Sequence, residues 1–164
     1  MLILEAERDT LLKPLQAVTG IVERKHTLPI LSNVLIERTG GQTNILATDL
    51  EIQIHTHGPH TDAEDFRITT NAKKLQDILR ALPEGAIVAL DWAQNRLTLK
   101  ASKSRFALQT LPAEDFPLMS IGEEVVSAFT LPQETFRNML SQVQYAMAVQ
   151  DIPYYLNGFL MQVE

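Results

Sequence analysis

The chain has 164 residues, 45% hydrophobic and 21% charged, a composition typical of a globular protein with at least one well-buried core. It contains no cysteine, which excludes disulfides, thiolate nucleophiles and cysteine-based zinc sites and is typical of a reducing, cytoplasmic compartment. The net charge of -6 at pH 7 excludes a protein that covers nucleic acid with its whole surface, so any such contact must be local.

The N-terminal segment predicts a strand followed by an amphipathic helix. Residues 2–6 alternate as a strand does, and residues 9–19 place apolar side chains at helical spacing. The early acids Glu5, Glu7 and Asp9 are unlike an export signal. Apolar runs in the chain are only a few residues long, far short of the roughly 20 residues that span a bilayer.

The same pattern returns twice. Residues 66–70 alternate and Asn71 is a favourable helix N-cap, while residues 128–131 are expected to form a strand leading into Pro132, a favoured first helical residue. The apolar stripes of the three predicted helices align at constant offsets of 64 and 61 residues; they are Leu11, Leu15 and Val18, then Leu75, Leu79 and Leu82, then Phe136, Leu140 and Val143. Three positions kept in register through three copies indicate a structural repeat.

Between the helices the sequence predicts strands joined by short turns. The strands after the first helix are residues 33–38, 43–48 and 51–57, with turns at Gly40-Gly41 and Gly58-Pro59. Those after the second helix are residues 86–91, 96–101 and 105–111, with a turn at 93–95. Each unit is therefore one strand, one helix and about three strands, and two units make an α+β domain.

A domain boundary is expected near residue 121. Residues 111–124 combine prolines with acids and predict a linker, which gives a first domain over residues 1–121. Residues 122–164 then hold the rest of the linker and an incomplete start of a second domain. The third unit is expected to stop after one helix and about one or two strands, and about 40 residues rarely form a stable core alone. We therefore expect a fragment, or a second domain that is incomplete.

The histidines are the main candidates for metal chemistry. His55 and His57 would lie on one face of a strand, near His60, and two imidazoles there could share a metal ion. The favoured interpretation is a solvated face, with Ile52 and Ile54 turned toward the core. The sequence also lacks a G-x-S-x-G elbow, a P-loop, a dinucleotide fingerprint and an H-E-x-x-H motif. We predict no catalytic residues, no metal and no cofactor; a histidine-dependent metal enzyme is the alternative.

Basic residues are unevenly placed. Residues 96–113 carry four of them and no acid, a pattern that requires an anionic neighbour or solvent. Residues 23–26, after the first helix, are the best candidate for phosphate contact, and solubility alone explains them equally well. Basic residues on the predicted helices extend this surface, although nearby acids dilute it; they are Lys13, Lys73, Lys74, Arg80 and Arg137.

Several strings of the sequence occur in the same order in one known family. The shorter strings are LPIL at residues 28–31, TDL at 48–50 and LPEGA at 82–86, and the longer ones cover residues 104–117 and 150–158. Together they extend over nearly the whole chain. It resembles the N-terminal domain and the start of the central domain of the bacterial DNA polymerase III beta subunit, the beta sliding clamp.

The resemblance implies the DNA clamp fold, with three similar domains per chain and two chains closed head to tail into a ring. It implies a processivity factor of the replicative polymerase that encircles and slides on duplex DNA, is not itself an enzyme and needs no cofactor. The implied partners are double-stranded DNA, a second clamp chain, the polymerase III alpha subunit and the clamp loader, in the cytoplasm and without a membrane. An interaction module unrelated to DNA is the remaining alternative.

The same resemblance implies roles for individual residues. Those that match DNA contacts of the family are Arg24, Lys25, Gln150, Tyr154 and Tyr155. Those that match the edge paired with the third domain of the neighbouring chain are Arg96, Lys103, Arg105, Phe106 and Leu108. Tyr155 and Leu156 match the beginning of the groove that binds partner peptides. Pro153 departs from the family, because a basic residue is frequent there. Without the third domain, the chain is expected not to close the ring and to bind such peptides weakly or not at all.

Overall fold

The computed structural model describes residues 1–22, 28–60, 64–119, 129–148 and 154–162. The chain divides into two compact units, unit 1 over Met1–Ser120 and unit 2 over Ile121–Glu164. Each unit is treated by itself below. None of the helices in the described ranges is long and apolar enough to cross a bilayer.

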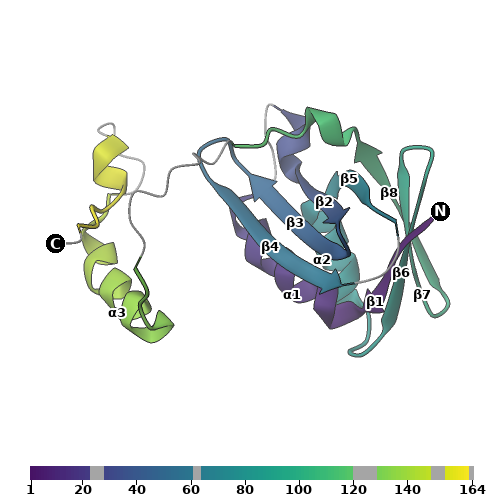
Figure 1. Cartoon of the computed structure of the whole chain (residues 1–164), viewed down its shortest axis with the longest axis horizontal. Coiled ribbons are helices and arrows are strands. Elements are labelled where there is room, and N and C mark those ends of the chain that lie inside the picture. Colours follow the sequence, from purple (N-terminus) through teal and green to yellow (C-terminus); the bar gives the residue numbers. More distant parts are fainter. Residues whose placement is uncertain (23–27, 61–63, 120–128, 149–153, 163–164) are drawn as a thin grey trace. The chain divides into compact units, whose positions relative to one another are not determined.

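Unit 1 repeats one order of elements twice (Figure 1). The first copy consists of β1 (Leu2–Glu7), α1 (Arg8–Val18), β2 (Asn33–Thr39), β3 (Gln42–Thr48) and β4 (Gln53–His60). The second consists of β5 (Phe66–Asn71), α2 (Ala72–Ala81), β6 (Ile87–Ala93), β7 (Arg96–Ala101) and β8 (Ser104–Leu111). Two short 3-10 helices, η1 (Thr19–Ile21) and η2 (Pro29–Ser32), lie between α1 and β2, and a third, η3 (Ala113–Asp115), follows β8. The predicted order of strand, helix and three strands is confirmed in both copies.

The two copies exchange their first strands. The sheet order is β1-β6-β7-β8-β5-β2-β3-β4, so β1 pairs with β6 of the second copy and β5 pairs with β2 of the first. Both pairings are antiparallel. Helices α1 and α2 contact each other on one side of the strands (Figure 1). Neither copy can therefore complete its sheet without the other.

The predicted apolar stripes of the first two helices form the core. Leu15 and Leu79 are each 1% exposed, and both lie in one cluster with the inward residues of the strands. Six stripe residues are buried in all; they are Leu11, Leu15, Val18, Leu75, Leu79 and Leu82. The predicted N-cap at Asn71 is also confirmed, because its Oδ1 accepts a hydrogen bond from the backbone N–H of Lys74 at 2.9 Å.

The predicted strand boundary at Gly58-Pro59 is wrong. Strand β4 continues through both residues to His60, with a register shift against β3 between Gln42 and Asn44. Strand β4 is an edge strand of the sheet. An edge strand tolerates proline, because a residue without a backbone N–H can face away from the neighbouring strand. The expectation for Ile52 is wrong as well, because this side chain is 52% exposed, whereas Ile54 packs against the core.

The segment predicted as a linker begins with packed structure. Ala113 and Phe116 are buried against Leu35 and Leu46, whose side chains project from the side of the sheet opposite the main core. Phe116 is 4% exposed. The chain from residue 111 to 116 thus covers an outer patch of β2 and β3 and is not a free connection.

Unit 2 contains one α-helix in its described part, α3 (Gln133–Val143), and the 3-10 helices η4 (Gln144–Ala146) and η5 (Tyr154–Asn157). Residues 129–131 form no strand, and Pro132 is the N-cap of α3 and not its first residue, so both expectations for this copy are wrong. The stripe is exposed at Phe136 (36%) and Val143 (44%). The physical reason is that no strand in the described residues of this unit lies against α3.

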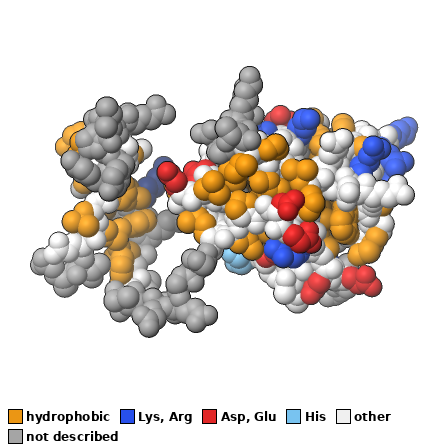
Figure 2. Space-filling model, turned by 90° about the horizontal axis from the view of Figure 1, so that it is seen from above, with side chains coloured by type: hydrophobic (Ala, Val, Ile, Leu, Met, Phe, Trp, Pro, Cys, Tyr) orange, Lys and Arg blue, Asp and Glu red, His pale blue; other side chains and the backbone are white. Residues whose placement is uncertain are grey.

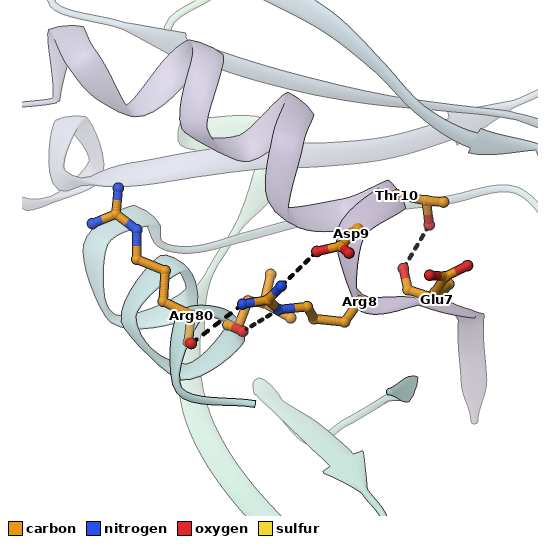
Figure 3. A network of polar contacts seen from close by, with 6 residues as sticks. Glu7, Arg8, Asp9, Thr10 and Arg80 are labelled. Atoms are coloured by element: carbon orange, nitrogen blue, oxygen red, sulfur yellow. Dashed lines mark hydrogen bonds and ion pairs between the residues drawn. The ribbon is translucent and has the colours of Figure 1, made fainter. Parts of the chain in front are cut away.

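An arginine at the start of α1 ties the two helices together (Figure 3). Arg8 donates from Nε to the carbonyl oxygen of Leu79 at 2.8 Å and from Nη2 to that of Arg80 at 3.3 Å. Its Nη1 forms an ion pair with Oδ1 of Asp9 at 2.6 Å. The guanidinium therefore satisfies carbonyls at the C-terminal end of α2, where a cation is favourable, while the Asp9 carboxylate lies in the first turn of α1.

We predict that Arg8→Ala lowers the free energy of unfolding by about 2 kcal/mol, because the substitution removes charge-assisted hydrogen bonds to partly buried carbonyls. Urea denaturation followed by circular dichroism measures the change. Lys13→Ala, which truncates an exposed cation of the same helix, is the control and should stay within about 0.5 kcal/mol of the parent. Equal effects of the two substitutions would contradict the role given to Arg8.

Candidate functional site

The edge of β8 is the first candidate surface. On one side, β8 pairs with β7 from Ser104 to Gln109. On the other side, it pairs with β5 only at its last two residues, Thr110 and Leu111. Within the described residues, the stretch Ser104–Gln109 therefore has one strand neighbour and presents a row of main-chain groups that another strand can pair with.

Alternation along β8 separates its side chains into two faces. Phe106 and Leu108 turn toward the core, where Leu108 is 6% exposed and Phe106 is half-buried. Arg105 lies on the opposite, exposed face. Of the two apolar residues predicted for an interface, Phe106 thus retains surface for a partner, whereas Leu108 is already covered within unit 1.

Positive charge accumulates beside this edge. The register of β7 and β8 places Lys100 directly opposite Arg105, and Figure 2 shows Lys and Arg side chains at the end of unit 1 formed by these strands. Lys100 forms an ion pair with Asp91 of β6, with 2.8 Å between Nζ and Oδ2. In the described part of the chain, Arg96, Lys103 and Arg105 have no ion pair, so the edge favours an anionic partner.

Two residues beside the edge of β8, Asp91 and Lys74, were not predicted from the sequence to lie there. Asp91 lies outside the acid-free stretch of sequence, and only the pairing of β6 with β7 brings it to Lys100. Lys74 belongs to α2, and it lines a hollow with Ala107 and Gln109 at the point where β8 and β5 diverge. No local sequence pattern could have placed either residue beside β7 and β8, because each comes from a distant segment of the chain.

The outward face of the two helices is the second candidate surface. It exposes Lys13 and Gln16 on α1, and Lys74, Asp77 and Arg80 on α2. Asp77 places a carboxylate among the cations, so the face is only mildly basic. Such a surface suits weak contacts with phosphates, not tight binding.

Several residues predicted to contact DNA cannot be placed. Arg24, Lys25 and Gln150 lie outside the described residues, as does Pro153. Tyr154 and Tyr155 belong to η5, where only their backbone is described. Leu156, predicted for a peptide groove, is 45% exposed. In the same unit, an apolar hollow is lined by α3 and by residues 159–162.

The histidines form a pair on the exposed face of β4. The ring centroids of His55 and His57 are 4.9 Å apart, and Nδ1 of His57 lies 3.0 Å from Oδ1 of Asn44. In the part of the chain that the structure describes, no group of three or more histidine, cysteine or acidic side chains could hold a metal ion. For a metal enzyme, the described residues therefore offer the imidazoles of His55 and His57 and no third histidine, cysteine or acidic ligand grouped with them.

Comparison with known proteins identifies relatives over nearly the whole chain. Residues 2–120 match the family described as DNA polymerase III beta subunit, N-terminal domain. The beta sliding clamp of Pseudomonas aeruginosa is 43% identical over 158 residues, and that of Escherichia coli K12 is 42% identical over 162 residues. Each alignment covers 96% of this chain and 43% of the relative, so the chain spans less than half the length of the relatives it matches.

Solved structures give the same result. The crystal structure of DNA polymerase III subunit beta from Pseudomonas aeruginosa is similar with a TM-score of 0.88 at 42% identity, covering 96% of this chain and 43% of that one. The Caulobacter crescentus pol III beta structure has a TM-score of 0.87 at 38% identity, covering 94% and 41%. The similarity thus holds in both sequence and three-dimensional structure.

We predict that Arg105→Glu stabilises the 164-residue chain by about 0.5 kcal/mol, because it replaces two opposed cations with a cross-strand pair to Lys100. The gain should shrink in high salt. Lys103→Glu makes the same change in net charge in the turn before β8 and is the matched control. Urea unfolding at low and high salt distinguishes the two, and a loss of stability in Arg105→Glu would show that the pairing of charges is not unfavourable.

Proposed function

The chain belongs to the family of bacterial DNA polymerase III beta subunits, the sliding clamps, and on that premise we propose that it forms part of a ring that encircles duplex DNA. In this proposal, unit 1 is the first of three domains, and unit 2 is the beginning of the second. Its role is to keep the replicative polymerase on its template in the cytoplasm. The ring itself performs no catalysis and holds no cofactor.

The open basic edge of β8 is the observation that carries the proposal. A strand edge with one neighbour, three cations without ion pairs in the described residues and a half-buried Phe106 together suit a partner strand with carboxylates beside it. The proposed partner is the third domain of a second, identical chain. Arg96, Lys103 and Arg105 would meet its acids, and the half-buried Phe106 would form the apolar part of the contact, while Leu108 supports the edge from the core of unit 1.

The helix face supports a sliding contact with DNA. Lys13, Lys74 and Arg80 can reach phosphates, while Asp77 and the net charge of -6 limit the strength of binding. Phosphates are equivalent at every step of a duplex, so contacts to them fix no register. Arg24 and Lys25, with Gln150, Tyr154 and Tyr155, are the proposed additional contacts.

Partner proteins are proposed to bind to unit 2 and to the later domains of the full-length protein. Tyr155 and Leu156 would form the beginning of a groove for short peptides of the polymerase alpha subunit and the clamp loader. Energy for opening the ring would come from the loader. No further ligand of this chain is required for these roles.

A topological experiment tests the ring. The full-length protein carrying this sequence is loaded onto nicked circular DNA by a clamp loader, the DNA is linearised, and bound protein is separated by gel filtration. We expect the protein to stay on circles, to leave linear DNA, and to stay on linear DNA whose ends are blocked by a bulky protein. Equal retention on open linear DNA would rule out sliding by encirclement.

A charge reversal tests the DNA-facing loop. In the full-length protein, Arg24→Glu with Lys25→Glu should weaken duplex binding and reduce the slope of log K against log salt by about 0.9 for each phosphate that the protein no longer neutralises. Arg67→Glu, on the sheet beside Glu37, is the control and should leave the slope unchanged. An unchanged slope in the loop variant would remove Arg24 and Lys25 from the proposed DNA-binding surface.

A further inference from the structure

An apolar surface on unit 1 takes no part in the proposed ring edge or helix face. It is a hollow of about 420 Å³ lined by the start of η2 and the residue before it, the turn before β4, the end of β8, the last residue of η3 and the segment after it. The lining residues are Leu28, Pro29, Ile30, Leu50, Leu111, Asp115 and Pro117. Figure 2 shows hydrophobic side chains gathered on this face, with carboxylates beside them. We call this surface the Leu50 hollow.

Leu50 is held in a conformation that leucine rarely adopts. Its φ is +80°, in the left-handed region that favours glycine, and its side chain is 48% exposed. Leu50 therefore has an unfavourable backbone conformation, and burial of its side chain does not compensate for it. Strain of this kind persists where the surrounding structure enforces it, and it concentrates at ligand-binding positions.

The neighbouring residues enforce this turn through hydrogen bonds. Oδ1 of Asp49 accepts from the backbone N–H of Glu51 at 2.9 Å and of Ile52 at 2.7 Å. Oγ1 of Thr48 accepts from the N–H of Leu50 at 3.1 Å and donates to the carbonyl of Ile52 at 2.9 Å. The turn is thus rigid, and it projects Leu50 at the hollow without a further ordering cost on binding.

Among the described residues, three carboxylates lie in or next to the lining of the hollow. Asp115 is the charged residue of its lining, and Glu51 and Glu114 are exposed on the adjoining turn and on η3. None of these three carboxylates takes part in an ion pair among the described residues. A fitting ligand therefore has an apolar centre and positive charge on either side.

From this geometry we infer that the Leu50 hollow is a docking site for an extended peptide of a partner protein that places two aliphatic side chains in the hollow, flanked by Lys or Arg. Alternate residues of an extended peptide point the same way, so two aliphatic residues separated by one position enter together. The volume lies within the range of roughly 300 to 1,000 Å³ of ligand pockets. This inference concerns unit 1 alone and holds whether or not the ring forms.

Three labelled heptapeptides test the inference against the 164-residue chain by fluorescence anisotropy. The probe is GKLGLKG, and the controls are GELGLEG, with reversed charge, and GKSGSKG, without aliphatic side chains. We expect both controls to bind at least about tenfold more weakly than the probe. Equal binding of all three peptides would overturn the inference.

One substitution tests both the location of the site and the backbone strain at Leu50. Leu50→Gly should reduce binding of the probe about tenfold and yet raise the melting temperature by about 2 to 4 °C, because glycine relieves the positive φ. Ile87→Thr removes an exposed apolar side chain outside the hollow and should leave probe binding unchanged. Unchanged probe binding in Leu50→Gly would overturn the site.

Sedimentation of the free chain separates the proposed occupant from a second copy. The inference expects the same sedimentation for the parent and for Leu50→Gly. A parent dimer that dissociates in Leu50→Gly would assign the hollow to self-association and overturn the peptide site.

Discussion

The exchange of first strands between the two copies of the repeat is the constraint on which unit 1 depends. Because β1 completes the sheet of the second copy and β5 completes that of the first, each copy has an unfinished sheet by itself. The two helices meet on one side of the strands as a consequence, and their apolar stripes share one core. Arg8 adds a polar connection at the point where the copies meet.

This pairing also creates the surfaces available for function. Strand β8 diverges from β5 after two residue pairs, which leaves most of its length with a single neighbour. The helices occupy the side of the strands away from Phe116, so their polar faces remain open. One arrangement thus gives a sheet edge suited to a second chain and a mildly basic helix face suited to weak contact with a duplex.

Local conformation is less uniform than the repeat. Leu50 has positive φ and an exposed side chain at the turn before β4, whereas Gly40 and Gly41 occupy the preceding hairpin without strain. Arg38 is 1% exposed in β2 and donates to the carbonyl of Ile3 at 3.4 Å. At these positions the backbone conformation or the burial of the side chain differs from what the residue type and the periodic pattern predict, because tertiary contacts determine it.

The sequence by itself determined the order of strands and helices, the two packed stripes and the Asn71 cap, because these follow from periodicity and from hydrogen bonds within a few residues. It also indicated the family, through strings spread along nearly the whole chain. Only the tertiary structure decided which strands exchange, that Asp91 meets Lys100, that Leu108 is buried while Phe106 is half-buried, and that β4 continues through Pro59. Those features depend on residues far apart in the chain, and a periodic pattern carries no information about which distant neighbour a strand will meet.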